Sequence, residues 1–457
     1  MLYSTPLPYA TNAAAYFAAI ADLPWAVWLD SGGRGRYDIL CAQPTVTLVT
    51  YGTHTEITNA SGVQCVTADP FDLLRQQLGA PVAAIPGIPF AGGALGYWGY
   101  DLARRLHTLP TLTQNTEHLP DMMAGIYDWA LVLDHQEKST HLVSQLREQA
   151  TAEVLPQILA RLLQSSKVPQ EKFKVHGRIQ SNFTRAGYKS AFDAIQRFLR
   201  AGDCYQVNLA QRYAARASGH ALQAYLKLRR LSPAPYSAYL NFPHAQILCA
   251  SPERFLQVQQ GRVETNPIKG TRPRLKNRHE DAMMAQELAL SDKDHAENLM
   301  IVDLLRNDLG KSCESGSVHV PKLFKLESFA QVHHLVSTVI GQLAPGRDAL
   351  TLLQDCFPGG SVTGAPKQRA MQIIEQLEPH RRGVYCGAIG YIGFDGNMDS
   401  NITIRTLVFA DGEIRFWAGG GIVADSDADA EYQETLDKAA AILKVLQQYG
   451  GKYECEA

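Results

Sequence analysis

Two acidic segments contain the side chains best suited to bind a divalent cation. The first runs from Asp294 to Leu305 and has the length and composition of a helix. On a helix, Glu297 shares a face with Ile301 and Leu304, so its carboxylate points toward the side that should be buried. A buried carboxylate needs a cationic partner, because an unpaired charge is costly to remove from water. The pattern therefore indicates either a metal ligand or a salt bridge at the end of the helix.

The second acidic segment, residues 429–443, predicts another helix. Glu431, Glu434 and Lys438 follow one another at helical spacing beside an apolar stripe. The stripe consists of Leu436, Ala439, Leu443 and Leu446. The same pattern is also typical of a solvated, salt-bridged helix face. Two helices that each offer oxygen ligands, with no His or Cys at ligand spacing, favour Mg²⁺ over zinc.

One lysine and one arginine lie in sequence contexts that allow chemistry. Lys269 stands between an apolar residue and a glycine in Pro267–Thr271, where partial burial lowers the pKa of an amine and makes it nucleophilic. An ordinary lysine in a surface turn fits the same residues.

Alternation along a strand over residues 401–406 puts Arg405 on the polar side. There its guanidinium suits a carboxylate ligand or a surface salt bridge.

Three glycine-rich segments have different interpretations. Pro358–Lys367 resembles a phosphate loop but lacks the required Gly-Lys-Ser/Thr ending, so nucleotide binding is not expected. Gly419, Gly420 and Gly421 leave backbone N–H groups open to a small anion, or else form a tight turn. The glycines of residues 92–101 do not match the dinucleotide fingerprint and predict close packing of backbones.

The elements that must position these residues fall into two parts. Residues 1–135 are predicted to be rich in strands, because runs such as residues 45–50 largely alternate and are separated by Gly and Pro. Residues 151–164 have helical spacing of apolar residues, with Pro156 tolerated in a first turn. The polar segment 165–172 is predicted to be the linker. The second part carries the chemistry.

Composition excludes several classes of function. The 457 residues carry a formal net charge of −2 and are 46% hydrophobic. Without a clustered basic excess, neither nucleic acid nor an anionic membrane is an expected partner. Apolar stretches are broken too early to span a bilayer. The eight cysteines form no Cys-x-x-Cys pair, which indicates reduced thiols and a cytoplasmic protein.

Taken in order along the chain, these segments resemble the chorismate-utilising enzymes, which include the anthranilate, aminodeoxychorismate, isochorismate and salicylate synthases. The resemblance extends over nearly the whole chain and includes Phe90–Tyr97 and Leu119–Met122. It implies an α+β fold in which two large, mostly antiparallel β-sheets pack together with helices outside. It further implies an N-terminal region over residues 1–165, a linker over 166–184, and a chorismate-binding region over 185–450 that is intertwined with the first.

The resemblance also implies roles for individual residues. It places Mg²⁺ ligands at Glu297 and Glu434, with Asp294 and Glu431 acting through water. Glu253 matches the general acid that protonates the departing C4 hydroxyl of chorismate. The residues implied in substrate binding are Gly270, Thr271, His334, Tyr385, Arg405, Gly419, Gly420, Gly421 and Lys438.

Two positions distinguish the reactions within this family. Where water-adding members have a lysine base, this chain has Gln206, so water is not the expected nucleophile. Anthranilate-forming members typically read Pro-Ile-Ala-Gly-Thr where this chain has Lys269. The lysine implies covalent attack on C2 of chorismate and addition of ammonia at C4, which makes 4-amino-4-deoxychorismate. Formation of anthranilate is the alternative, and a non-catalytic, regulatory chorismate-binding homologue is a second.

The resemblance extends to partners and to a second ligand. The chain has no Cys-His-Glu constellation in an amidotransferase context, so ammonia is expected from a separate glutamine amidotransferase subunit. A further enzyme would then release 4-aminobenzoate for folate biosynthesis. Some family members bind tryptophan, and the matching stretches here contain Ser31, Pro235 and Tyr236. They depart from the feedback-regulated forms, so feedback control is not expected and structural binding of tryptophan stays open.

Overall fold

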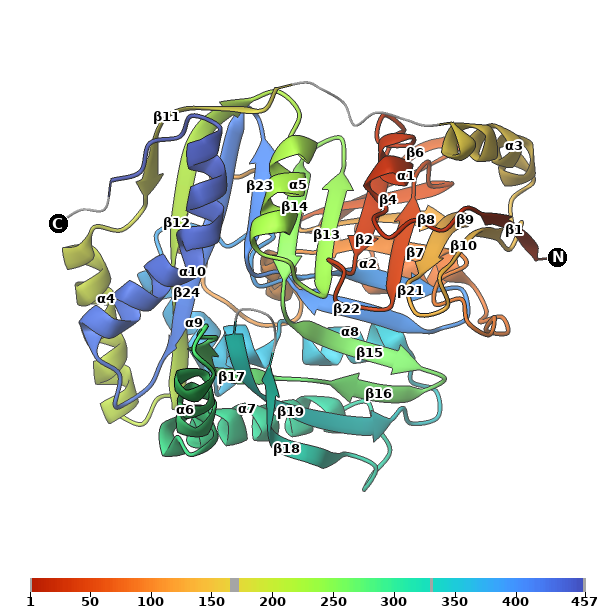
Figure 1. Cartoon of the computed structure of the whole chain (residues 1–457). Coiled ribbons are helices and arrows are strands. Elements are labelled where there is room, and N and C mark those ends of the chain that lie inside the picture. The colour runs from red at the N-terminus through yellow and green to blue at the C-terminus, as the bar shows by residue number, and fades with distance from the viewer. Residues whose placement is uncertain (1, 165–171, 329–331, 455–457) are drawn as a thin grey trace.

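The computed structural model describes residues 2–164, 172–328 and 332–454. Within these ranges the strands form two twelve-stranded sheets with antiparallel neighbours. Helices lie outside them (Figure 1). The predicted fold class, α+β with two large antiparallel sheets, is confirmed.

The first sheet joins strands from both parts of the chain. In spatial order it contains β1 (Tyr3–Leu7), β10 (Ser139–Ser144), β9 (Trp129–Asp134), β3 (Tyr37–Cys41), β2 (Ala26–Asp30), β13 (Tyr236–Asn241), β14 (Gln246–Ser251), β23 (Thr406–Ala410), β24 (Glu413–Ile422), β12 (Gln206–Ser218) and β11 (Lys174–Ser181), with β20 (Gly364–Ala365) paired to β12. The two parts meet where β2 pairs with β13.

The second sheet is mixed in the same way. In spatial order it contains β17 (Ile268–Pro273), β19 (Val332–Gln342), β16 (Arg262–Thr265), β15 (Arg254–Gln259), β22 (Met398–Ile402), β21 (Ala388–Gly393), β7 (Gly93–Trp98), β8 (Met122–Tyr127), β4 (Val46–Tyr51), β5 (His54–Asn59) and β6 (Gly62–Val66), with β18 (His319–Ser328) paired to β19. Here the two parts meet where β7 pairs with β21. Both sheets therefore require the N-terminal and C-terminal parts at once.

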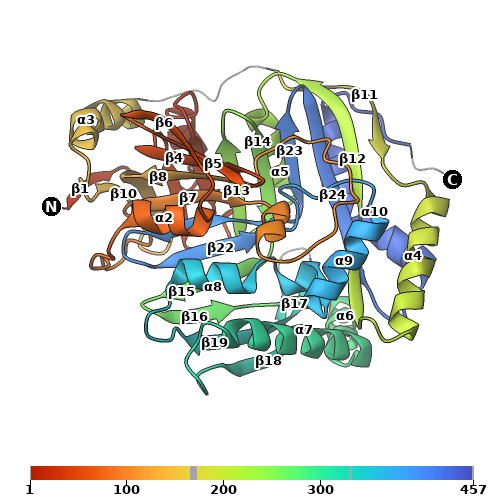
Figure 2. The same ribbon diagram turned by 180° about the vertical axis from the view of Figure 1, so that it is seen from behind.

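The helices cover the outer faces of the sheets. They are α1 (Ala14–Ala18), α2 (Pro70–Leu78), α3 (Gln149–Leu163), α4 (Arg185–Arg200), α5 (Leu222–Leu231), α6 (Arg278–Ala289), α7 (Asp292–Gly310), α8 (Ala349–Cys356), α9 (Lys367–Leu377) and α10 (Ala428–Gln448), with 3₁₀ turns η1 (Tyr100–Arg105) and η2 (Gly360–Val362). Helix α10 packs on β24, and α7 packs on β17 and β19 (Figures 1 and 2). Among the described residues, no helix is both long and apolar enough to cross a membrane.

The main core lies between the two sheets. Its buried side chains include Val27 and Cys249 from the first sheet and Leu95 and Ile389 from the second, so the sheets pack face to face. Burial of this apolar surface is the main favourable contribution to folding.

Close approach of strands explains the predicted packing role of the glycines in residues 92–101. A Cβ atom on Gly96 would lie 2.0 Å from the carbonyl oxygen of Met123 on the adjacent strand β8. No side chain fits in that space, so glycine is required where β7 passes β8. The prediction of close backbone packing is confirmed.

Two sequence predictions are wrong in their boundaries. Helix α3 begins at Gln149, so Pro156 lies in its middle and not in its first turn. Burial of Leu155, Ile158 and Leu162 holds the helix together despite the missing N–H group. Strand β11 lies within the predicted linker 166–184 and pairs with β12, so the linker is shorter than predicted. Most of the linker segment 165–172 lies outside the described residues.

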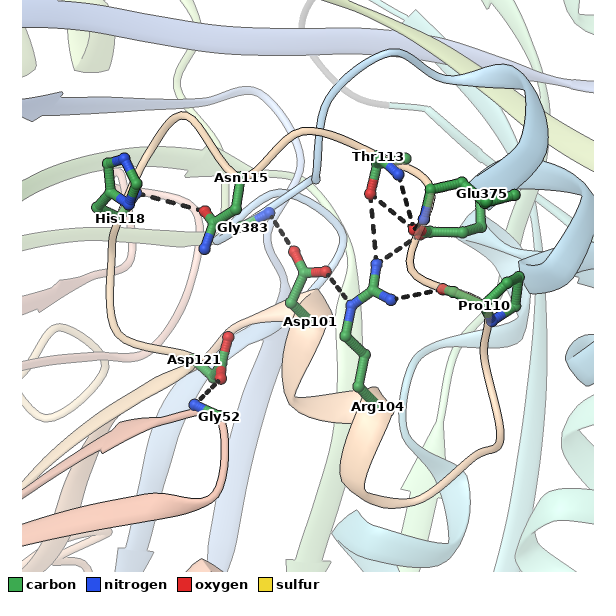
Figure 3. Close-up of polar contacts among 11 residues, drawn as sticks. Gly52, Asp101, Arg104, Pro110, Thr113, Asn115, His118, Asp121, Glu375 and Gly383 are labelled. Atoms are coloured by element: carbon green, nitrogen blue, oxygen red, sulfur yellow. Dashed lines mark hydrogen bonds and ion pairs between the residues drawn. The ribbon is translucent and has the colours of Figure 1, made fainter.

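A buried ionic network ties the N-terminal part to the C-terminal part. Arg104 on η1 donates from Nε to Asp101, 2.9 Å away, and its Nη2 pairs with Glu375 on α9 (Figure 3). Glu375 also accepts from the backbone N–H of Thr113, and Asp101 accepts from the backbone N–H of Gly383. Burial alone would raise the pKa of Glu375, but the backbone donors and Arg104 lower it.

We expect Arg104→Met to lower the free energy of unfolding by about 3 kcal/mol, because it leaves the buried Asp101 and Glu375 without their cation. Urea unfolding measures the change. The matched control is Arg306→Met, which breaks an exposed pair with Asp303 and should cost less than about 1 kcal/mol. Equal losses in the two variants would contradict the structural role of the network.

Candidate functional site

The first acidic segment lies on α7, as predicted. The Ser291 side chain caps this helix by accepting from the N–H of Asp294 at 3.2 Å. The Glu297 side chain is only 18% exposed, and Lys293 lies 3.9 Å from it. Burial raises the pKa of Glu297 and the charges of Asp294 and Glu434 raise it further, while Lys269 and Lys293 lower it. The carboxylate of Glu297 thus faces a partly desolvated region that already holds other carboxylates.

The second acidic segment lies on α10. Glu431, in the first turn, is 7% exposed; its Oε1 accepts from Ser426 Oγ at 2.6 Å. Its Oε2 is buried and has no hydrogen-bond partner among the described residues. Glu434 is half-exposed and forms an ion pair with Lys438, which lowers its pKa although burial opposes this. The interpretation of this segment as a purely solvated face is therefore wrong for Glu431.

Gly420 on β24 lies directly under these two carboxylates. A Cβ atom there would lie 3.0 Å from Glu431 Oε2 and 3.2 Å from Glu434 Oε1. The glycine therefore leaves open the space into which both side chains point. Within the described ranges, no three His, Cys, Asp or Glu side chains already converge as a metal-binding group. The carboxylates of α7 and α10 share a region, and in this structure lysines balance part of their charge.

Lys269 lies on strand β17 next to a bulge. Gly270 has φ +78°, and the pairing of β17 with β19 shifts register there. The Lys269 amine donates to Gln206 Oε1 at 3.3 Å. Burial lowers the pKa of Lys269, while the charge of Glu297 opposes this. The alternative of a lysine in a surface turn is wrong.

Glu253 lies between β14 and β15 and is 7% exposed. Its Oε1 accepts from Ser361 Oγ at 2.8 Å. Burial raises the pKa of Glu253 to about 7, although Ser361, Lys269 and Lys438 lower it. A carboxyl group with such a pKa can hold a proton near neutral pH and release it, as a general acid must. The structure therefore brings a partly desolvated amine and a buried acid to the same region.

The predicted ring-site residues meet at the end of this region. Thr271 on β17 is opposite His334 on β19, and its Oγ1 lies 2.9 Å from His334 Nδ1. Burial and the charge of Arg405 lower the pKa of His334 to about 4, so the imidazole is neutral at pH 7. Tyr385 is buried and stacks on Trp417 with ring centroids 6.0 Å apart. Burial raises the pKa of Tyr385, which therefore keeps its hydroxyl proton.

Arg405 does not lie on the strand predicted over residues 401–406. Strand β22 ends at Ile402 and β23 begins at Thr406, and Arg405 between them has φ +51°. Burial lowers the pKa of Arg405, and no described carboxylate pairs with its guanidinium. A buried guanidinium without a counterion is a strong binding group for a carboxylate. The direction of this side chain thus comes from a sharp backbone bend and not from strand alternation.

Gly419, Gly420 and Gly421 lie in strand β24, opposite β12, so the alternative of a tight turn is wrong. A Cβ atom on Gly419 would lie 2.5 Å from Leu209 O. The Lys438 amine donates to Gly419 O at 3.0 Å. Strand β23 pairs with β24 only as far as Phe416, so the glycines have a paired strand on one side alone.

Comparison with known proteins identifies the family. A sequence profile of the chorismate binding enzymes matches residues 26–444. This chain belongs to the chorismate binding enzymes. It is 48% identical to aminodeoxychorismate synthase component 1 of Klebsiella aerogenes, over 96% of this chain and 98% of that one. The same protein of Escherichia coli is 48% identical over 94% and 95% of the two chains.

A solved structure of the family has the same fold. Anthranilate synthase component I from Streptococcus pneumoniae superimposes with a TM-score of 0.80 at 33% identity, over 89% of this chain and 91% of that one. The predicted family is confirmed, and these two relatives have the name of the enzyme that Lys269 and Gln206 predict.

The sequence of this chorismate binding enzyme did not point to Ser361 as part of the site. Ser361 lies in the glycine-rich segment that resembles a phosphate loop, and its contact with Glu253 joins residues that are distant in sequence. The one available signal is a hydroxyl residue directly after two glycines, in a segment without a nucleotide-binding ending. The sequence indicates only that Gln206 cannot act as a base, and it does not predict the contact of Gln206 with Lys269.

One cavity of the structure is lined by none of the site residues described above. Ser31, Pro235 and Tyr236 all line this space of about 610 Å³. The Arg254 guanidinium covers the ring of Tyr236, with 5.1 Å between its central carbon and the ring centroid. Arg254, which lines the cavity, is the first residue of β15 and directly follows Glu253. The cavity and the proposed acid are therefore adjacent along the chain.

Proposed function

We propose that this chain converts chorismate and ammonia into 4-amino-4-deoxychorismate, as a transferase of the kind named in its relatives. The observation that carries the proposal is the half-buried Lys269 amine. It donates to Gln206 Oε1 at 3.3 Å and lies close enough to Glu253 for their charges to interact. An amine with a lowered pKa beside an acid with a raised pKa fits addition with loss of water.

The reaction then has two steps. Lys269 Nζ forms a bond to C2 of chorismate while Glu253 gives its proton to the C4 hydroxyl. The ring double bonds shift, the C4–O bond breaks, and water leaves. Ammonia next forms a bond at C4, the double bonds shift back, and the C2–Nζ bond breaks to restore the lysine. The Gln206 carboxamide accepts a hydrogen bond from the lysine amine. Because a carboxamide is not a base, Gln206 does not activate water as a nucleophile.

The carboxylates of substrate are held by separate groups in this proposal. Arg405, whose guanidinium has no carboxylate partner among the described residues, and Tyr385 bind the enolpyruvyl carboxylate. Thr271, Lys438 and the backbone of Gly419–Gly421 lie at the ring carboxylate. The neutral imidazole of His334 lines the ring. This arrangement orients C2 toward Lys269 and C4 toward Glu253.

The acidic residues fit Mg²⁺, which members of this family are expected to use. Oxygen ligands on α7 and α10 are the donors that this ion prefers, and the buried Glu431 Oε2 has no partner among the described residues. Glu297 and Glu434 would hold the ion, with Asp294 and Glu431 acting through water. When bound, Mg²⁺ neutralises the ring carboxylate of chorismate.

The proposal includes partners and a second ligand. The relatives are named as component 1, which supports a second component, a glutamine amidotransferase subunit that supplies ammonia. The product would pass to a lyase that makes 4-aminobenzoate for folate, in the cytoplasm. The cavity lined by Ser31, Pro235 and Tyr236 supports a tryptophan pocket as a structural site. Residues 1–165 and the region from 185 to 450 are proposed as the two intertwined regions.

Product analysis tests the proposed function. The purified chain is incubated with chorismate, Mg²⁺ and ammonium, and the products are separated by liquid chromatography before and after addition of an aminodeoxychorismate lyase. We expect 4-aminobenzoate only after the lyase is added. Direct release of anthranilate would favour the alternative activity, and absence of turnover would favour a non-catalytic homologue.

A further inference from the structure

The glycine-rich segment Pro358–Lys367 is mostly buried and does not form a phosphate loop. The Lys367 amine pairs with Asp308 Oδ2 at 2.6 Å and donates to Cys356 O at 2.6 Å. Arg382 Nη1 donates to Val362 O at 2.9 Å. The cation that would bind phosphate in such a loop is therefore used inside the protein, and the segment needs another explanation.

The glycines of this segment let it pack tightly beside the general acid. A Cβ atom on Gly360 would lie 2.5 Å from Leu304 Cδ2 on α7, and one on Gly359 would lie 3.0 Å from Ile402 Cδ1 on β22. Ser361 follows directly and is buried, as is Glu253. Its Oγ donates to Glu253 Oε1 at 2.8 Å. The close packing thus fixes a single hydroxyl against one oxygen of the acid.

A hydroxyl that donates to one carboxyl oxygen decides where the carboxyl proton sits. Because Oε1 of Glu253 accepts from Ser361, the proton of the neutral acid resides on Oε2. We propose that Ser361 is a positioning residue for the reaction, which holds Glu253 so that Oε2 presents its proton to the hydroxyl that leaves C4. This inference rests on the proposed function, in which Glu253 is the general acid.

The same contact influences the charge of Glu253. Burial raises its pKa, and the Ser361 hydrogen bond and the charges of Lys269 on β17 and Lys438 on α10 lower it. Cys386, whose own pKa is raised by burial to about 12, also faces Glu253 and stays a neutral thiol near pH 7. Removal of the hydroxyl takes away a donor that favours the ionised carboxylate, so the pKa of Glu253 should rise above about 7.

The test compares Ser361→Ala with Thr363→Val by measuring kcat and kcat/KM from about pH 5 to about pH 10. Thr363 is buried in the same segment, and among the described residues its hydroxyl donates only to the carbonyl groups of Gly359 and Gly360. Thr363→Val therefore removes a neighbouring buried hydroxyl without touching Glu253. The active form needs Glu253 protonated and Lys269 unprotonated, so the plot of rate against pH bends at two pKa values. The bend near pH 7, here called the limb near pH 7, reports the pKa of Glu253 whether it lies on the acidic or the alkaline side of the optimum.

We expect Ser361→Ala to lower kcat about tenfold and to move the limb near pH 7 upward by about one pH unit. Thr363→Val should leave this limb in place. An unchanged limb in Ser361→Ala, or the same shift in both variants, would overturn the positioning role. Failure of the proposed function is a separate outcome, because the wild-type chain would then form no 4-amino-4-deoxychorismate at any pH.

Discussion

Lys269→Ala is expected to lower kcat/KM for formation of 4-amino-4-deoxychorismate by roughly three orders of magnitude, because covalent attack has no substitute nucleophile. The amine donates to Gln206 Oε1 at 3.3 Å, and its charge lowers the pKa of Glu253. Residual turnover in the alanine variant should come from slow direct addition of ammonia, with an anthranilate-like product. The measurement is steady-state kinetics with product separation.

Lys269→Arg is the matched control for charge. It keeps a cation at the same place on β17, but a guanidinium does not lose its proton and is a poor nucleophile. We expect it to be as inactive as the alanine variant. If arginine restores turnover, the lysine acts only as a positive charge and the covalent route is wrong.

The pH dependence of the wild-type enzyme follows from the same group. Burial lowers the pKa of Lys269, and the unprotonated amine is the reactive form. At low pH the amine is protonated and the rate is low, so the rate should rise with pH as the amine loses its proton. In Lys269→Ala this dependence should disappear, whereas a limb near pH 7 that belongs to Glu253 should stay.

The second large effect concerns the carboxylates of α7 and α10. We expect Glu297→Gln and Glu434→Gln each to lower Mg²⁺-dependent turnover by about two orders of magnitude or more, because transition-state charge stabilisation of several kcal/mol is lost. Glu297→Gln should fold, because an amide of equal size replaces a carboxylate that burial already disfavours. Glu434→Gln should also fold, because it breaks only a half-exposed ion pair with Lys438. Isothermal titration with Mg²⁺ alone should show weaker binding in both.

Asp303→Asn is the control for this pair of variants. Asp303 lies on the same helix as Glu297, but it is exposed and pairs with Arg306 in a surface salt bridge. We expect its Mg²⁺ titration and its turnover to match the wild type. Near-normal metal binding and turnover in both glutamine variants would show that the metal site lies elsewhere.

The spacing of residues along the sequence predicts which face of a helix is buried. The helix spacing of Glu297 relative to Ile301 correctly predicts that this carboxylate faces the buried side, because a helix fixes the direction of each side chain over a few residues. The same holds for the stripe on α10 that places Glu431 and Glu434 beside packed residues. The family resemblance added the reaction, which no periodicity could supply.

Features that depend on distant contacts or on backbone exceptions were not predictable in this way. Alternation through residues 401–406 predicts a strand that includes Arg405, but a positive φ turns the chain there. The contact of Ser361 with Glu253 and that of Gln206 with Lys269 each join strands or turns brought together only by the sheets. The pairing of β2 with β13, which joins the two parts of the chain, cannot be predicted from the local sequence pattern either.

The central claim is that Lys269 forms a covalent bond to the substrate, and mass spectrometry tests it most directly. The wild-type chain is held with chorismate and Mg²⁺ without ammonia, quenched, digested and compared with Lys269→Arg treated in the same way. We predict that the peptide containing Lys269 gains the mass of chorismate less one water, and that the arginine variant gains none. An unmodified Lys269 peptide under conditions in which added ammonium restores rapid turnover would contradict the covalent mechanism.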